Sequence, residues 1–79
     1  MDIKSKIGNR IKELRDFKQM SQKDLAYASD LDRSYIASVE NGKRNISIIN
    51  IEKISAALGV DLKEFFNTNS FENITTNKK

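Results

Sequence analysis

Apolar residues at the start of the chain recur at steps of three and four, which is the spacing of one face of an α-helix. Between about residues 3 and 18, this stripe consists of Ile3, Ile7, Ile11, Leu14 and Phe17. We therefore expect a first amphipathic helix that buries the stripe against the rest of the domain.

A shorter helix is predicted next. Ser21 can cap it, and Asp24 lies in its first turn, where a negative charge is favourable. This helix ends near Ser29. The residues expected to be buried on it are Leu25, Ala26 and Ala28.

The polar segment 30–32 interrupts the pattern before a third helix. Asp32 is placed to cap this helix, and Gly42 is placed to end it with a left-handed residue. Ile36 and Val39 are predicted to point inward. Because the connection between the second and third helices is so short, the two must cross steeply, as they do in a helix-turn-helix.

Two further helices and a polar tail complete the chain. Ser47 is expected to cap the fourth helix and Gly59 to end it, and Asp61 with Glu64 resembles a capping box for a short fifth helix. The apolar residues of these two helices are Ile48, Ile51, Ile54, Leu58, Leu62, Phe65 and Phe66. Residues 67–79 are expected to form a flexible tail with isolated Phe71 and Ile74.

These elements predict an all-α fold with one domain over residues 1–66. The chain has 79 residues, no proline and three glycines, which suits one helical core with tight connections. Cysteine and histidine are absent, so the usual thiolate and imidazole metal ligands and the usual general base are missing. We expect no metal, no cofactor and no catalysis, and we find no membrane segment or signal peptide, which predicts a cytoplasmic protein.

The charge is unevenly distributed along the chain. The formal net charge is only +3, but residues 1–45 carry ten Lys and Arg against seven Asp and Glu, whereas residues 46–66 carry two against three. Lys43 and Arg44 form a basic pair directly after the third helix. This distribution is compatible with a polyanionic partner that meets the N-terminal two-thirds of the chain.

The segment SQKDLAYASDLDRSYIASVENGKRN, residues 21–45, resembles the helix-turn-helix family of phage repressors and related bacterial (XRE-type) regulators. Within that family the chain is most similar to the controller proteins of restriction–modification systems. The resemblance spans roughly residues 7–66 and implies a compact five-helix bundle of the lambda-repressor-like type. Two positions depart from the family pattern: Asp30 stands where glycine is common in the turn, and Ile46 stands where proline is common. Aspartate tolerates a left-handed backbone better than most residues, so we expect the turn to form.

The third helix carries the candidates for reading base sequence, because the first turns of such a helix lie closest to base edges in the major groove. Arg33 is the strongest candidate, since a guanidinium can bond guanine O6 and N7 together. Its alternative is a solvated surface arginine. Tyr35 could contact the DNA edge or merely cover the end of the bundle. The candidate base contacts are Arg33, Ser34, Tyr35, Ala37 and Ser38.

Phosphate contacts are expected at the start of the second helix and in the loop after the third, because free N–H groups at helix N-termini attract anions. Capping is the alternative role of Ser21, and a solubilising loop is the alternative for the basic pair. The candidates are Ser21, Gln22, Asn41, Lys43, Arg44 and Asn45.

Two further sets of residues are expected to support DNA binding. By resemblance, Arg15 and Glu40 form an ion pair between the first and third helices, the alternative being two separate surface charges. Ile49, Val60 and Phe65 are expected to form a homodimer contact, because the chain after Ile49 has more apolar surface than a small bundle can bury. The alternative for Phe65 is the core.

Together these features predict a dimeric transcriptional regulator that binds a palindromic double-stranded operator. The resemblance implies control of its own promoter, with RNA polymerase as a possible further partner. The rival hypotheses are a phage-type repressor, an antitoxin with the same module, and a protein-interaction scaffold that does not bind DNA. The basic pair after the third helix favours DNA, because a protein adaptor has no need of it.

Overall fold

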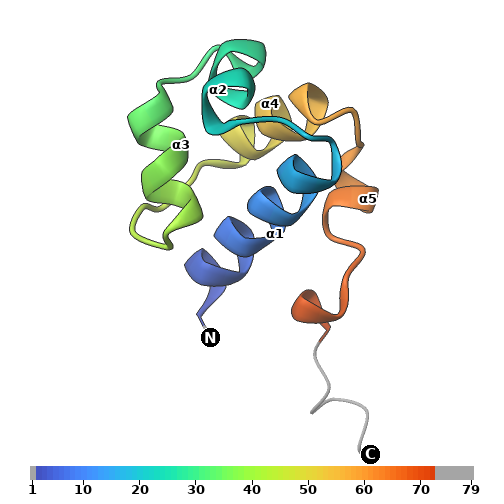
Figure 1. Ribbon diagram of the computed structural model, residues 1–79. Helices are drawn as coiled ribbons and strands as arrows, with labels where there is room; N and C mark the ends of the chain where they lie inside the picture. The colour runs from blue at the N-terminus through green and yellow to red at the C-terminus, as the bar shows by residue number, and fades with distance from the viewer. Residues whose placement is uncertain (1, 73–79) are drawn as a thin grey trace, which may run out of the picture.

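The computed structural model describes residues 2–72, and within them the chain folds into five α-helices and one short 3₁₀ turn, without strands (Figure 1). The elements are α1 (Ile3–Phe17), α2 (Gln22–Ser29), α3 (Arg33–Glu40), α4 (Ile48–Ala57), α5 (Leu62–Phe65) and the turn Asn69–Phe71. The predicted all-helical class and the number of helices are confirmed. No helix in the described part is both long and apolar enough to cross a membrane.

Most helices begin at a side chain that accepts a hydrogen bond from the first turn. Ser21 and Ser47 cap α2 and α4 as predicted, and Asp2 and Asp61 cap α1 and α5. Asp32 occupies the N-cap position of α3, but its side chain accepts no capping bond. The start of α3 is therefore set by the preceding turn more than by a cap.

That preceding turn adopts the left-handed conformation the sequence predicted. Asp30 has φ 59° and ψ 42°, and the N–H of Leu31 donates to the carbonyl of Ala26 at 3.0 Å. Aspartate tolerates this backbone region better than most residues, so the turn forms without the glycine that is common there. Gln19 has a similar φ of 58° after α1.

The helices are arranged around α1. In Figure 1, α3 lies on one side of α1 and α5 on the other, with α2 and α4 across the remaining face. Helix α3 packs on α1 and α2, while α4 packs on α2 and α5. We divide the molecule into a reading half, built from α2 and α3, and a C-terminal half, built from α4 and α5, which contact each other directly through α2 and α4.

The core contains the inner stripes of all five helices. The fully buried side chains are Ile11, Leu25, Ile36, Val39, Ile54, Ser55, Leu58 and Phe65. Three residues predicted on core stripes are instead exposed: Ile3, Phe17 and Ile48, at 60%, 79% and 63%. The predicted burial of Ala28 is also wrong. Ile3, Phe17 and Ile48 lie at helix ends, where the neighbouring helices no longer cover the stripe.

Residues after α5 continue to pack on the domain. The ring of Phe71 lies edge-on to the ring of Phe66, with 5.0 Å between centroids, and Phe66 packs in the same way on Phe65. The predicted boundary at residue 66 thus leaves out one ring that contacts the domain. Residues 73–79, which include Ile74 and most of the predicted tail, lie outside the described residues.

Candidate nucleic-acid interface

Helix α3 presents one face to solvent and one to the core. Ile36 and Val39 are buried as predicted, whereas Arg33 and Ser34 in the first turn are exposed. Ala37 and Ser38 are half-buried on the same outward side. The first turn of α3 is therefore free to approach a base edge, and contact between these side chains and DNA remains a prediction.

A buried ion pair locks α3 to α1. Arg15 donates from Nε to Glu40 Oε2 at 2.7 Å and from Nη2 to Glu40 Oε1 at 3.0 Å. The Glu40 side chain is only 2% exposed and that of Arg15 only 11%. The hydrogen bonds that Arg15 donates to Glu40 raise the pKa of Arg15 above its usual value, against the opposing effect of burial. The pair predicted by resemblance therefore forms, and it is not two separate surface charges.

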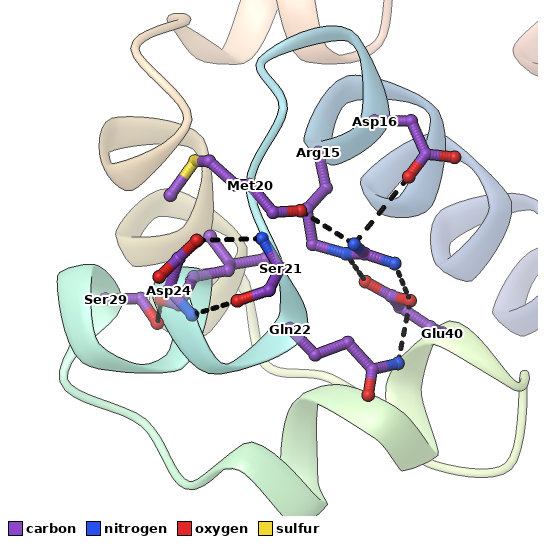
Figure 2. A network of polar contacts seen from close by, with 9 residues as sticks. Arg15, Asp16, Met20, Ser21, Gln22, Asp24, Ser29 and Glu40 are labelled. Atoms are coloured by element: carbon purple, nitrogen blue, oxygen red, sulfur yellow. Dashed lines mark hydrogen bonds and ion pairs between the residues drawn. The ribbon is translucent and has the colours of Figure 1, made fainter.

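The same carboxylate also holds the start of α2. Figure 2 shows the Gln22 side chain reaching Glu40, where its Nε2 donates to Oε1 at 3.1 Å. Arg15 Nη1 donates in turn to the carbonyl of Met20 at 2.8 Å. Glu40 thus fixes both the scaffold and a predicted phosphate contact. Because an amide nitrogen carries two hydrogens, Gln22 keeps one donor for an anion.

Ser21 and Asp24 close a two-way capping box at the N-terminus of α2. The N–H of Asp24 donates to Ser21 Oγ at 2.9 Å, and the N–H of Ser21 donates to Asp24 Oδ2 at 3.0 Å. The backbone hydrogen bond from Ser21 holds the pKa of Asp24 below its usual value. The capping role of Ser21 is confirmed, and a phosphate contact by the same residue remains a prediction.

The predicted phosphate contacts of the loop after α3 lie at the surface. Asn41, Lys43 and Asn45 are exposed. The Arg44 guanidinium lies 4.8 Å from the centroid of the Tyr35 ring, in cation–π contact. Arg44 is therefore held beside the reading helix.

Tyr35 also contacts a residue that the sequence interpretation missed. Asn50, on α4, donates from Nδ2 to the Tyr35 hydroxyl at 3.0 Å. The ring is partly buried and packs against the core, so it covers the junction of α3 and α4, which was one of its two predicted roles. No signal in the sequence marks Asn50, because the fold alone brings position 50 beside position 35.

Gly8 was also missed, and it sets the distance between α1 and α3. A methyl group at Gly8 would lie 2.4 Å from the Val39 carbonyl oxygen and 2.6 Å from that of Glu40. Such contacts are far below van der Waals separation, so only glycine lets the two helices approach this closely. The approach brings the backbone of Glu40 against α1 about two turns before Arg15.

Arg10 is a second buried arginine of α1 that sequence reasoning overlooked. It donates from Nε to the carbonyl of Phe65 at 2.6 Å and from Nη2 to that of Glu64 at 2.7 Å. The Phe65 carbonyl is at the end of α5, and the Glu64 carbonyl also accepts from the N–H of Asn67 at 3.1 Å. Arg10 also pairs with Glu13 at 2.8 Å. Its role is to hold the C-terminal half on α1.

The predicted dimer contact is revised by the structure. Ile49 is 64% exposed, as expected for a residue off the core stripe, and Val60 is half-buried. Phe65 is 0% exposed, so the prediction that it contributes to a dimer contact is wrong. Arg10 bonds the Phe65 carbonyl, and the Phe65 ring lies in the core. Ile48, exposed at 63%, lies next to Ile49 on the surface of α4.

Within the described residues, no three Asp, Glu, His or Cys side chains are grouped closely enough to hold a metal ion. The polar groups gathered around α3 are instead donors: a guanidinium, hydroxyls and amides. Donors on an exposed first turn, flanked by a basic loop and a capped helix N-terminus, suit contact with nucleic acid.

Comparison with known proteins decides the family. A family model described as "Helix-turn-helix" matches residues 11–65. The chain belongs to this helix-turn-helix family. It is 54% identical over 66 residues to the control protein C.MunI of a Mycoplasma species, which covers 82% of this chain and 89% of that protein.

Solved structures agree with this assignment. The restriction–modification controller protein C.AhdI from Aeromonas hydrophila superposes with a TM-score of 0.77 at 48% identity, covering 80% of this chain and 96% of that one. The controller protein C.Esp1396I, in its operator-bound tetramer, superposes with a TM-score of 0.80 at 42% identity, covering 84% and 87%. The predicted family, the lambda-repressor-like fold and the assignment to DNA-binding regulators related to controller proteins are confirmed.

Proposed function

We propose that the chain is a controller protein of a restriction–modification system, which binds a palindromic DNA operator as a dimer. The observation that carries the proposal is the state of α3: its first turn exposes Arg33 and Ser34, while Glu40 at its far end is buried and bonded to α1 and α2. A reading helix needs a free N-terminal turn and a rigid base.

The relatives support this proposal. One solved structure is that of a controller protein tetramer "in Complex with its Natural 35 Base-Pair Operator". If this chain acts in the same way, two copies of α3 enter successive major grooves about 34–36 Å apart. Arg44, Lys43 and Gln22 then contact the flanking phosphates.

The mechanism that follows is regulation by occupancy. A bound dimer beside a promoter can recruit RNA polymerase, and one overlapping the promoter excludes it. The residues gathered at α3 are donors suited to DNA, so we propose a binding function without catalysis, carried out in the cytoplasm. Because affinity depends on two half-sites, the concentration of the protein sets the response.

The test of DNA recognition begins with selection of bound duplexes from a random pool, using the full chain. We expect a palindromic sequence to be enriched. Arg33→Ala should then weaken binding to the selected duplex by about 1–3 kcal/mol and relax discrimination at one position in each half-site. Equal losses on selected and random duplexes would reduce Arg33 to a phosphate contact. Failure of the full chain to enrich any sequence would refute the proposal.

The dimer contact is tested separately through Ile49, which we propose contacts a second copy together with Val60. Ile49→Glu places a charge on an exposed position, so the variant should fold normally but sediment as a monomer and bind the selected duplex poorly. Lys12→Glu is the control, because it reverses a charge at an exposed position on another helix, whereas the exposed positions of α4 lie beside Ile49. A variant that remains dimeric in sedimentation equilibrium would refute this interface.

A further inference from the structure

The Tyr35 hydroxyl already accepts one hydrogen bond within the protein. Asn50 Nδ2 donates to it at 3.0 Å, so the hydroxyl oxygen acts as the acceptor in that bond. A phenol has one hydrogen to donate. Among the described residues, no protein group accepts that hydrogen. Asn50 therefore leaves the hydroxyl with its donor unused.

Asn50, which donates this hydrogen bond, is itself held in place. Its backbone N–H donates to Ser47 Oγ at 3.1 Å in the cap of α4, and its side chain is half-buried. On the other side, the Arg44 guanidinium lies 4.8 Å from the Tyr35 ring centroid. The free hydroxyl hydrogen is therefore on a tyrosine whose ring also contacts the Arg44 guanidinium. A hydrogen-bond donor beside a cation favours the binding of an anionic oxygen.

We propose that Asn50 is a positioning residue for DNA binding: by donating to the Tyr35 hydroxyl, it directs the hydroxyl hydrogen to a DNA phosphate beside Arg44. The inference rests on the proposed function and extends it to α4. It also resolves the two predicted roles of Tyr35, because the ring covers the α3–α4 junction while the hydroxyl donates outward.

A double-substitution experiment tests the pairing, with the duplex selected by the full chain as the probe. Tyr35→Phe removes the hydroxyl but keeps the ring under Arg44, and should weaken binding about 2- to 10-fold. Asn50→Ala should cause a smaller loss. If the two act through one hydrogen bond, the double variant should bind no more weakly than Tyr35→Phe alone. Additive losses would overturn the proposal.

The polarity of the bond provides a second, sharper test. Asn50→Asp keeps the shape of the side chain but replaces the donor by an acceptor, which would take the hydroxyl hydrogen for itself. It should therefore weaken binding more than Asn50→Ala does. The same comparison in the Tyr35→Phe background measures the effect of the added charge alone, and the Asp-to-Ala difference should shrink there. If Asn50 acted only in folding, Asn50→Asp, which can still bond the Tyr35 hydroxyl, should restore the binding that Asn50→Ala loses.

The remaining outcomes separate this inference from the proposed function. Losses should be similar on the selected and random-sequence duplexes, because phosphates carry no sequence information. Losses confined to the selected duplex would overturn the phosphate assignment. Unchanged affinity in Tyr35→Phe, with Arg33→Ala still impaired, would overturn only this inference. Thermal melting by circular dichroism should show every variant folded at the temperature of the binding assay.

Discussion

Two arginines on α1 hold the two halves of the molecule, and they do so with different partners. Arg15 binds the Glu40 carboxylate and so fixes the reading half, while Arg10 binds the last carbonyls of α5 and fixes the C-terminal half. Both side chains are almost fully buried, at 11% and 9% exposed. Orientation of the reading helix thus depends on a charged pair, whereas attachment of α5 depends on backbone acceptors.

Because their partners differ, the two arginines should differ in how much stability is lost when each is removed. Removing Arg15 leaves a buried carboxylate without its countercharge, which is among the most costly defects a folded protein can carry. Removing Arg10 deprives two neutral carbonyls of strong hydrogen bonds. It leaves no buried charge without a partner. The two halves should therefore fail to different extents and in different places.

The largest effect is expected from Arg15→Ala. We expect a loss of about 3–5 kcal/mol in the free energy of unfolding, because the 2% exposed Glu40 carboxylate keeps only its bond from Gln22. Urea denaturation followed by circular dichroism measures it. Lys12→Ala, at an exposed position on the same helix, is the control and should change stability by less than about 0.5 kcal/mol. Equal stabilities for the two variants would show that the pair contributes nothing.

Arg10→Ala should cost about 1.5–3 kcal/mol, the range for hydrogen bonds from a charged donor. The effect should also be local. In hydrogen exchange, amides of α5 should lose protection first, while amides of α3, held by Glu40, should keep theirs. Arg10→Lys should recover part of the loss, because an ammonium can still reach one of the carbonyls. If α3 loses protection as much as α5 does, then the two halves are not held independently.

Two glycines offer a comparison that does not involve charge. Gly8→Ala places a methyl group 2.4 Å from the Val39 carbonyl oxygen and should push α3 away from α1, at a net cost of about 1–3 kcal/mol despite the better helix propensity of alanine. Gly59→Ala, in the C-terminal half, meets only the end of Lys18 at 3.6 Å. Its cost is conformational, about 1 kcal/mol for φ of 77°.

The readout that distinguishes them is DNA affinity. At a temperature where both variants are folded, Gly8→Ala should weaken binding to the selected duplex because α3 is displaced, whereas Gly59→Ala should bind as the parent chain does. Normal binding by Gly8→Ala would indicate that α1 bends to absorb the clash, and that the reading helix is not positioned by this contact.

The features that could be predicted from the sequence are those whose interacting residues can also be recognised in the sequence. Local chemistry predicts the caps at Ser21 and Ser47, the left-handed turn at Asp30 and the inner face of α3. The partner of Arg15 is a carboxylate that the family resemblance identifies. Arg10 has backbone carbonyls as acceptors, and every residue has a carbonyl, so no pattern marks the ones that are used.

Misplaced residues have a related physical origin. The burial of Phe65 depends on how α5 folds back onto the bundle, a tertiary arrangement that also brings the Phe65 carbonyl to Arg10, 55 positions away. Ile3, Phe17 and Ile48 obey the helical period but lie beyond the last turn that a neighbour covers, and the period carries no information on where that cover ends. Asn50 and Gly8 depend on how α4 and α1 meet α3, which only the tertiary arrangement determines.

The smallest effect concerns the capping box at the start of the reading half. The pKa of Asp24 is lowered by the backbone hydrogen bond from Ser21, so its folded value lies below the unfolded value of about 3.9. The stabilisation is therefore complete above the unfolded pKa and is lost as the pH falls through the folded pKa. NMR titration of the Asp24 carboxyl carbon should give a value below 3.9. Asp24→Asn should show a shallower loss of stability in acid than the parent chain, and a titration at or above 3.9 would mean that the box does not bind the charged form.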